Sequence, residues 1–313
     1  LGLLTELMSH FLDELQHSSA IIENVEVLIC DNASTDGTKE FLRSIENPLV
    51  RVIAHDENFG GDFNVRTCFE GALGEYVWII GDDDLPMIGT VSLILKALQH
   101  QRLDLLFLRH SWQNHDLNYS DNPKVEEEGV EWKTRLSFAT QVGTHITFLS
   151  SFVVNKGQYV SLFGEDKCHK YADSNLPHLA WILPMLRCGE NLFVTDSIVM
   201  TARGNNSGGY SVAEAFGIQL PWILETELGK DNQLNKLFRV FIFSRFLPIW
   251  LVRARFSNTS FSREINWRAL DASGRKTPEY LIYIRPLRVL PKFLSLLLVS
   301  FGRLALRYLL EVA

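Results

Sequence analysis

The sequence has few cysteines and no long apolar run. Its four cysteines, Cys30, Cys68, Cys168 and Cys188, are far apart and form no C-x-x-C pair. This spacing argues against a zinc ribbon or a disulfide scaffold and favours a reducing compartment. The longest apolar run, 293–302, has ten residues, about half of what a membrane-spanning helix needs. The N-terminal stretch has no basic segment before its apolar residues, so we expect no signal peptide.

The composition is that of a globular chain, with 46% hydrophobic and 21% charged residues among 313. The net charge of −7 argues against a general nucleic-acid binder. This charge is unevenly distributed. Residues 234–313 hold fourteen Lys/Arg and four Asp/Glu, a charge of +10, whereas the other 233 residues hold 16 and 33, a charge of −17. We therefore expect an acidic body and a basic tail with separate tasks.

Short apolar runs alternate with helical patterns along the first third of the chain. Strands are predicted over 25–30, 51–54, 75–80 and 104–108, and helices over 1–15, 39–45, 63–71 and 88–101. Further on, we expect a strand or buried segment over 142–154, a helix over 176–187 and helices from 231 onward. This order predicts an α/β fold with a mostly parallel sheet flanked by helices, and such sheets bind ligands beyond the carboxyl ends of their strands.

Three adjacent carboxylates, Asp82, Asp83 and Asp84, follow the third predicted strand. Adjacent carboxylates raise one another's pKa unless a cation is present. Oxygen-rich clusters of this kind suit Mg²⁺ or Mn²⁺, especially when a diphosphate adds further oxygens. The alternative is a solvated acidic turn that precedes the helix at 88. The position at the end of a buried strand favours the metal site.

Two polar loops follow the first and second predicted strands. In DNASTDGT (31–38), Asp31 or Asn32 can hydrogen-bond a nucleobase edge, although an Asx turn leading into a helix also explains the motif. In the 58–62 loop, Gly60 and Gly61 allow close approach to a ligand and Asp62 adds a polar group. The alternative for this loop is a tight connection that needs positive φ.

Taken in order, these motifs resemble the family 2 glycosyltransferases, which have the nucleotide-sugar-binding GT-A fold. LICDNASTDGT, then N-x-G, then GEYVWIIGDDD lie within 25–86, and a looser resemblance extends to about 210. The GGDFN and NNSGGY details are similar to the branch that builds bacterial O-antigen and other surface polysaccharides, abequosyltransferases included. The resemblance implies two regions: a catalytic domain over 1–230 and a helical, basic, membrane-associating region over 231–313.

The resemblance also assigns roles to residues that bind the donor. Asp31, with Asn32, would contact the nucleobase, and Asp62 and Asp83 would line the nucleotide-sugar site. The D-x-D signature falls on Asp82, facing the ribose or the metal, and Asp84, holding the divalent ion. Arg203 would close over the diphosphate, with a surface loop as the alternative. No His lies at 201–210 to supply the metal ligand that many relatives have there.

The general base is less well defined. Relatives carry a Glu-Asp pair whose Asp lies about eleven residues before a helix-ending Gly, and counting back from Gly189 gives His178. His178 can act near neutral pH, Asp173 is the rival, and an ordinary helix-start histidine is the alternative. The literal pair 165–166 lies too far upstream. His145 is a candidate for the acceptor site, and a packed strand histidine is the alternative for it.

Two further features complete these expectations. The family's first strand has no counterpart, so either the sequence is truncated or the sheet lacks a central strand. In 234–313, aromatic and leucine residues alternate with Arg and Lys, which suits an anionic membrane surface. A packed helical subdomain or an oligomer interface are the alternatives.

The sequence therefore predicts a metal-dependent, inverting, hexosyltransferase-type enzyme. It would move a sugar from a nucleotide-sugar to a hydroxyl of a lipid-linked bacterial polysaccharide, in the cytoplasm at the inner face of the plasma membrane. Two alternatives remain open: a non-catalytic transferase-like scaffold, since the Glu-Asp pair is missing, and a sugar nucleotidyltransferase with a similar sheet.

Overall fold

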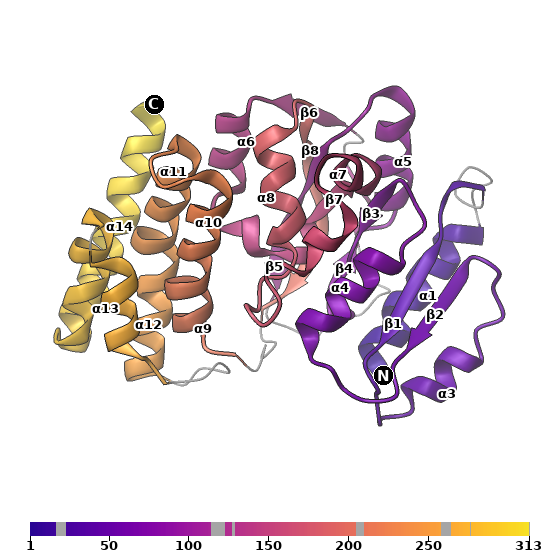
Figure 1. The fold of residues 1–313 in the computed structure, drawn as a ribbon, viewed down its shortest axis with the longest axis horizontal. Coiled ribbons are helices and arrows are strands. Elements are labelled where there is room, and N and C mark those ends of the chain that lie inside the picture. The colour runs from indigo at the N-terminus through magenta and orange to yellow at the C-terminus, as the bar shows by residue number, and fades with distance from the viewer. Residues whose placement is uncertain are drawn as a thin grey trace. The chain divides into compact units, whose positions relative to one another are not determined.

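The protein is described from a computed structural model that covers 1–16, 23–113, 123–126, 129–204, 210–257, 264–275 and 277–312. The chain divides into two compact units, which Figure 1 colours along the sequence. Unit 1 comprises Leu1–Phe138, Thr147–Asp173 and Pro177–Asn205, and unit 2 comprises Ala139–Ile146, Ser174–Leu176 and Asn206–Ala313. Residues 210–230, expected in the catalytic domain, belong to unit 2. The functional division into 1–230 and 231–313 stays a prediction.

Unit 1 is an α/β unit, which confirms the predicted class. Its strands are β1 (Val27–Asp31), β2 (Val50–Ala54), β3 (Tyr76–Trp78), β4 (Leu85–Pro86), β5 (Leu105–Gln113), β6 (Val130–Lys133), β7 (Phe152–Asn155) and β8 (Leu192–Arg203). Its helices are α1 (Gly2–Gln16), α3 (Thr38–Arg43), α4 (Gly61–Gly71), α5 (Thr90–His100), α7 (Lys156–Phe163), η4 (Glu165–His169) and α8 (Leu179–Cys188). Helix α6 (Arg135–Val142) and two 3-10 turns, η2 (Gly143–Thr147) and η3 (Leu149–Ser151), connect β6 to β7.

The strands form two sheets whose directions are mixed rather than mostly parallel. β1 and β2 pair in parallel, and the larger sheet has the order β3-β7-β5-β8-β4, with β6 also on β8. β5 and β8 are parallel, whereas β7 runs antiparallel to both β3 and β5. The expected segment 142–154 explains this difference. Its first part forms 3-10 turns, and only its end enters the sheet, in the reverse direction.

Strand β8 positions Asp84, the last residue of the acidic triplet that precedes β4. Its first half pairs with β6 and its second half with β4, on the side away from β5. Leu85 lies opposite Thr201 in this ladder, so the residue before Leu85 lies beside the last residues of β8. The register therefore brings Asp84 close to Arg203, although 119 positions separate them.

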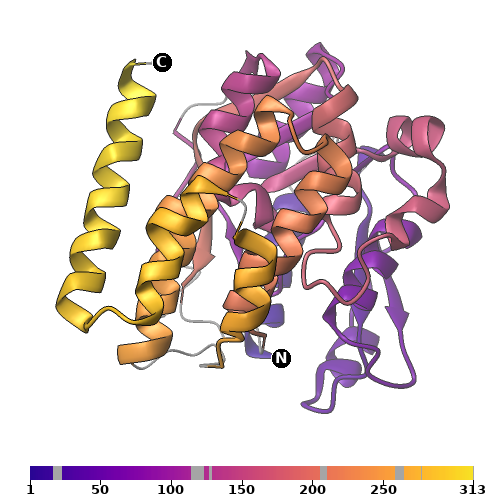
Figure 2. The same cartoon turned by 60° about the vertical axis from the view of Figure 1, so that its left-hand side comes forward.

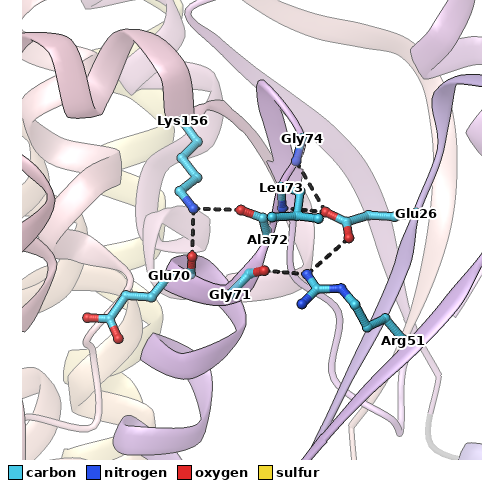
Figure 3. A network of polar contacts seen from close by, with 8 residues as sticks. All are labelled: Glu26, Arg51, Glu70, Gly71, Ala72, Leu73, Gly74 and Lys156. Carbon is cyan, nitrogen blue, oxygen red and sulfur yellow. Dashed lines mark hydrogen bonds and ion pairs between the residues drawn. The ribbon is translucent and has the colours of Figure 1, made fainter.

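The turn that follows α4 is held by two cationic side chains (Figure 3). The Nζ atom of Lys156 donates to the carbonyls of Glu70 and Ala72, at 2.8 and 2.7 Å. Arg51, on β2, donates to the carbonyl of Gly71 and forms an ion pair of 3.1 Å with Glu26. Cations at the carboxyl end of a helix satisfy carbonyls that have no partner within the helix and complement its dipole. These contacts join α4 to both β2 and α7.

Unit 2 is helical, as predicted for the chain from 231 onward. Its elements are α9 (Val212–Glu214), η5 (Ala215–Gln219), α10 (Leu220–Leu228), α11 (Gln233–Phe241), η6 (Ile242–Phe246), α12 (Leu247–Phe256), α13 (Trp267–Gly274), η7 (Tyr280–Ile284), η8 (Arg285–Arg288) and α14 (Lys292–Val312). Its core includes Phe238, Phe243 and Tyr280. Within the described ranges, no helix combines the length and the hydropathy that crossing a bilayer requires.

Candidate nucleotide-sugar site

Asp31 ends β1, where the apolar strand reaches the edge of its sheet. Its side chain is buried, and its Oδ1 accepts a hydrogen bond of 3.1 Å from the backbone N–H of Ser34. The other oxygen, Oδ2, is buried without a partner. Buried polar atoms nearly always have hydrogen-bond partners. The carboxylate is therefore fixed by an Asx-type turn and keeps one acceptor for a donor group such as the N–H of a base.

Asn32 connects the two polar loops. Its amide nitrogen donates to Asn58 at 2.8 Å, and its oxygen accepts from the backbone N–H of Phe59 at 3.0 Å. Gly60, with φ of 88°, precedes α4 in a conformation that other residues rarely adopt. Asp62 lies half-buried in the first turn of α4. The structure thus brings both loops together, and the first turn of α4 carries the acidic residue that complements the helix dipole.

The acidic triplet forms a tight turn between β3 and β4. The backbone N–H of Asp84 donates to the carbonyl of Gly81 at 3.1 Å. A Cβ atom at Gly81 would lie 2.6 Å from an oxygen of Asp83 and 3.3 Å from one of Asp84. Glycine at this position therefore allows two carboxylates to converge on the same turn, which a larger residue would push apart.

The three carboxyl groups differ in their surroundings. Asp84 is buried, and burial together with the charge of Asp83 raises its pKa to about 7. The pKa of Asp82 is also raised, first by loss of hydration and then by Asp83, with a smaller contribution from Asp36 of the DNASTDGT loop. Crowded carboxyl groups with raised pKa values are the arrangement that a divalent cation relieves.

Asp84 is held by two residues from distant parts of the chain. The hydroxyl of Ser150 donates to Asp84 Oδ2 at 2.7 Å, and the backbone N–H of Arg203 approaches Oδ1 at 3.4 Å. Ser150 Oγ also accepts from the backbone N–H of Gly81 at 2.9 Å. Ser150 therefore fixes both the start and the end of the acidic turn. Sequence reasoning missed this residue, since nothing in its apolar neighbourhood signals the role.

The guanidinium group of Arg203 is positioned by an ion pair. Its Nη2 lies 2.6 Å from Oε2 of Glu6 on α1, and its Nε is buried without a partner. An arginine held at one end with a donor left over suits a phosphate oxygen. Glu6, the second residue that sequence reasoning missed, resembles any acidic residue on an amphipathic helix. The adjoining 205–209 loop lies outside the described residues.

His178 and Asp173 lie on the segment that leads into α8. The His178 ring is buried and hydrogen-bonded to the backbone of Thr147, while its Nε2 has no partner. Burial lowers its pKa to about 4, so the ring is neutral at physiological pH and is a weaker base than an exposed histidine. Asp173 is exposed and has φ of 64°. A non-glycine residue in this region is uncommon and is found more often at functional sites.

The remaining histidine and carboxylate candidates lie in η2 and η4. His145 occupies the 3-10 turn η2 rather than the expected strand, and burial lowers its pKa. Glu165 and Asp166 are exposed at the start of η4. One group of mixed ligands, Glu70, Cys168 and His169, has its ligand atoms within 4.8 Å of one another. The Nε2 of His169 lies 2.5 Å from Glu70, so a hydrogen bond already accounts for that contact.

Comparisons with known proteins show what this chain is similar to. The family model described as "Glycosyl transferase family 2" matches residues 6–157. A curated relative, abequosyltransferase RfbV of Salmonella typhimurium (strain LT2), is 24% identical over 72% of this chain and 71% of its own. These matches confirm the resemblance inferred from the motifs. Residues 6–157 match the model of the family 2 glycosyltransferases, and the protein is a glycosyltransferase.

Solved structures show the same fold. The crystal structure of S. aureus TarS 1–349 in complex with UDP-GlcNAc has a TM-score of 0.55 and 18% identity, over 89% of this chain and 74% of that one. The complex of the same protein with UDP has a TM-score of 0.55 and 14% identity, over 96% and 84%. At these identities the likeness concerns the fold. It confirms the predicted GT-A architecture.

Proposed function

We propose that this glycosyltransferase moves a sugar from a nucleotide-sugar donor to a hydroxyl group of a bacterial surface polysaccharide under construction. The observation that carries the proposal is the set of buried atoms without partners on three residues predicted for the site: Asp31 Oδ2, Arg203 Nε and His178 Nε2. A base donor, a phosphate oxygen and an acceptor hydroxyl are, respectively, the groups that these atoms would bind. The proposal is further supported by S. aureus TarS, whose crystal structure contains UDP-GlcNAc.

We propose that a divalent cation takes part in the reaction. Asp82 and Asp84 would hold Mg²⁺ or Mn²⁺, because their carboxylate oxygens are hard ligands and their raised pKa values reflect uncompensated charge. When bound, the ion would stabilise the charge on the nucleoside diphosphate leaving group. Asp83 and Asp62 would line the same site, and Arg203, oriented by Glu6, would bind the diphosphate.

The acceptor hydroxyl would lose its proton to a base of the enzyme. His178 is the favoured base, since its neutral ring has an unpartnered Nε2, and Asp173 is the rival. General-base catalysis contributes roughly 10²–10⁴-fold to such reactions. Direct attack of the activated hydroxyl on the anomeric carbon inverts its configuration. We further propose that the acceptor is lipid-linked, and that the enzyme works in the cytoplasm at the inner face of the plasma membrane.

A panel of nucleotide-sugars tests this function. The enzyme is incubated with each donor and Mn²⁺, and donor hydrolysis is followed by release of the nucleoside diphosphate. One donor should be hydrolysed well above the others, and NMR of the first-formed product should show the inverted anomer. Retained configuration would refute the inverting mechanism. Hydrolysis of none of the donors, with or without a lipid-linked glycan acceptor, would refute the donor class.

A further inference from the structure

Helix α14 (Lys292–Val312) packs on unit 2 through its small residues. Ser295, Val299 and Gly302, spaced three and four positions apart, form its buried face. A Cβ atom at Gly302 would lie 2.7 Å from the carbonyl oxygen of Ser244 and 3.1 Å from the ring of Tyr283. The close approach explains why this face carries small side chains. It also leaves the large apolar residues of α14 to the opposite face.

The opposite face of α14 is apolar and exposed. We call it the α14 outer face, and its members, between 41% and 70% exposed, are Phe293, Leu294, Leu296, Leu297, Phe301 and Leu304. Figure 2 shows α14, in yellow, at the margin of the helices of its own unit. Ile282 and Val289, both exposed, precede it in the chain. A contiguous apolar surface of this kind marks a surface that binds something, whereas single exposed apolar residues need no explanation.

The charged residues that flank the α14 outer face are mostly cationic, although one of them, Arg288, forms an ion pair of 3.2 Å with Asp271. From 280 to 310 the sequence contains five cationic residues and no Asp or Glu. The three cations whose side chains the structure describes, Arg285, Arg288 and Lys292, are exposed. Two such surfaces from two copies of the chain would bring like charges together. An anionic bilayer instead offers headgroups to the cations and acyl chains to the apolar side chains.

We infer that the α14 outer face binds the surface of an anionic lipid bilayer, with α14 lying in the interfacial plane. This assigns the proposed membrane association to a particular surface of unit 2. Only the reason why the enzyme would bind a membrane rests on the proposed function. Phenylalanine and leucine side chains would enter the headgroup–acyl boundary, and the cations would bind lipid phosphates. Unit 2 would thereby keep the enzyme where lipid-linked acceptors are found.

Sedimentation with vesicles tests this inference without any donor or acceptor. The full chain is mixed with vesicles of phosphatidylcholine containing about one third phosphatidylglycerol, and with pure phosphatidylcholine vesicles. We expect binding to the anionic vesicles that weakens at high salt. The double variant Phe293→Ser/Phe301→Ser should lower the partition coefficient at least about tenfold, and Lys292→Glu about fivefold. Both phenylalanines are exposed, so the double variant should fold normally.

The matched control removes two exposed leucines from unit 1, Leu73→Ser and Leu162→Ser, and should bind like the wild type. Equal binding by the wild type and the Phe293→Ser/Phe301→Ser variant would overturn the inference, as would no vesicle binding by the wild type. A wild-type dimer in sedimentation velocity that the same variant dissociates would identify a second copy as the occupant instead. Donor hydrolysis in detergent is measured in parallel, so a failure of the proposed enzyme activity is recognised separately.

Discussion

The two units depart from ordinary burial in opposite ways. Unit 1 buries carboxyl groups at the ends of its strands, Asp31 and Asp84, whereas unit 2 exposes large apolar side chains along α14. Both arrangements are unfavourable for an isolated domain, because carboxylates lose hydration and apolar groups remain in water. We propose a partner of matching chemistry for each arrangement. For unit 1 it would be a cation with a nucleoside diphosphate, and for unit 2 a lipid surface.

If the units divide their tasks in this way, the largest effect comes from removing the Asp84 carboxylate. Asp84→Ala should lower the transfer rate on the order of a thousandfold, because the leaving-group charge loses its stabilisation. Vesicle binding by the same variant should equal that of the wild type. The measurement pairs a nucleoside diphosphate release assay with vesicle sedimentation. A variant that loses vesicle binding as well would contradict the division of tasks.

The buried carboxyl group of Asp84 also predicts how stability depends on pH in the metal-free protein. Its pKa of about 7 in the folded state lies above its ordinary value of 3.8. Between these values the folded state holds a proton that the unfolded state has released, so stability falls as pH rises from about 4 to about 7. The loss amounts to at most about 4 kcal/mol.

Urea unfolding over this pH range, in wild type and Asp84→Asn, measures the effect. Asn at this position still accepts from Ser150 but does not titrate. Burial lowers the pKa values of His10 and His178 to about 4. Their effect on stability has the opposite sign to that of Asp84, because they lower stability as pH falls below their ordinary pKa. Their contribution cancels in the difference between the two proteins. Parallel curves for wild type and variant would show that Asp84 is not the titrating group.

A smaller effect should follow at the other strand end. Asp31→Asn replaces the unpartnered acceptor by a group that can be a donor, so it should weaken nucleoside diphosphate binding by about 10- to 100-fold. Titration calorimetry with a panel of nucleoside diphosphates measures this loss. The matched control is Asp36→Asn in the same loop, whose carboxylate is bound by Thr38 and should matter less. Equal losses in both variants would argue against a specific role for Asp31.

The smallest effect tests the positioning of Arg203. Glu6→Gln removes the charge that holds the guanidinium group but leaves the arginine in place, so KM for the donor should rise about fivefold with kcat nearly unchanged. Arg203→Lys should raise it further, because lysine lacks the fork of donors. Steady-state kinetics over donor concentration separates the two parameters. A fall in kcat alone would place Arg203 outside the donor site.

Local sequence patterns were sufficient to predict the strands that are followed by polar site residues. The apolar run before Asp31 and the run before the acidic triplet both become strands, as predicted. The helix predicted over 63–71 forms as α4, which begins two residues earlier, at Gly61 of the predicted loop. The order of the strands in the larger sheet depends on pairing between distant parts of the chain. Val154 faces Val77 on one side and Leu105 on the other, a position that its own neighbours in sequence do not indicate. The residues that hold the site, Ser150 and Glu6, act across 66 and 197 positions.

Sequence reasoning also did not predict which face of α14 is exposed. The basic, apolar character of the tail was apparent from composition, but which residues face outward depends on the packing of Gly302 against Ser244 and Tyr283. A helix with leucine on most of its circumference has no unique buried face until its neighbours are known. The tail's association with membranes therefore stays a prediction, now assigned to particular side chains.

The central claim is that a divalent cation, held by the acidic turn, binds the nucleoside diphosphate in unit 1. Calorimetric titration of the nucleoside diphosphate of the preferred donor, with and without Mn²⁺, in wild type and Asp84→Ala, tests it most directly. The account predicts that Mn²⁺ strengthens binding to the wild type at least about tenfold and has no such effect on the variant. Equal affinity in all four titrations would contradict it.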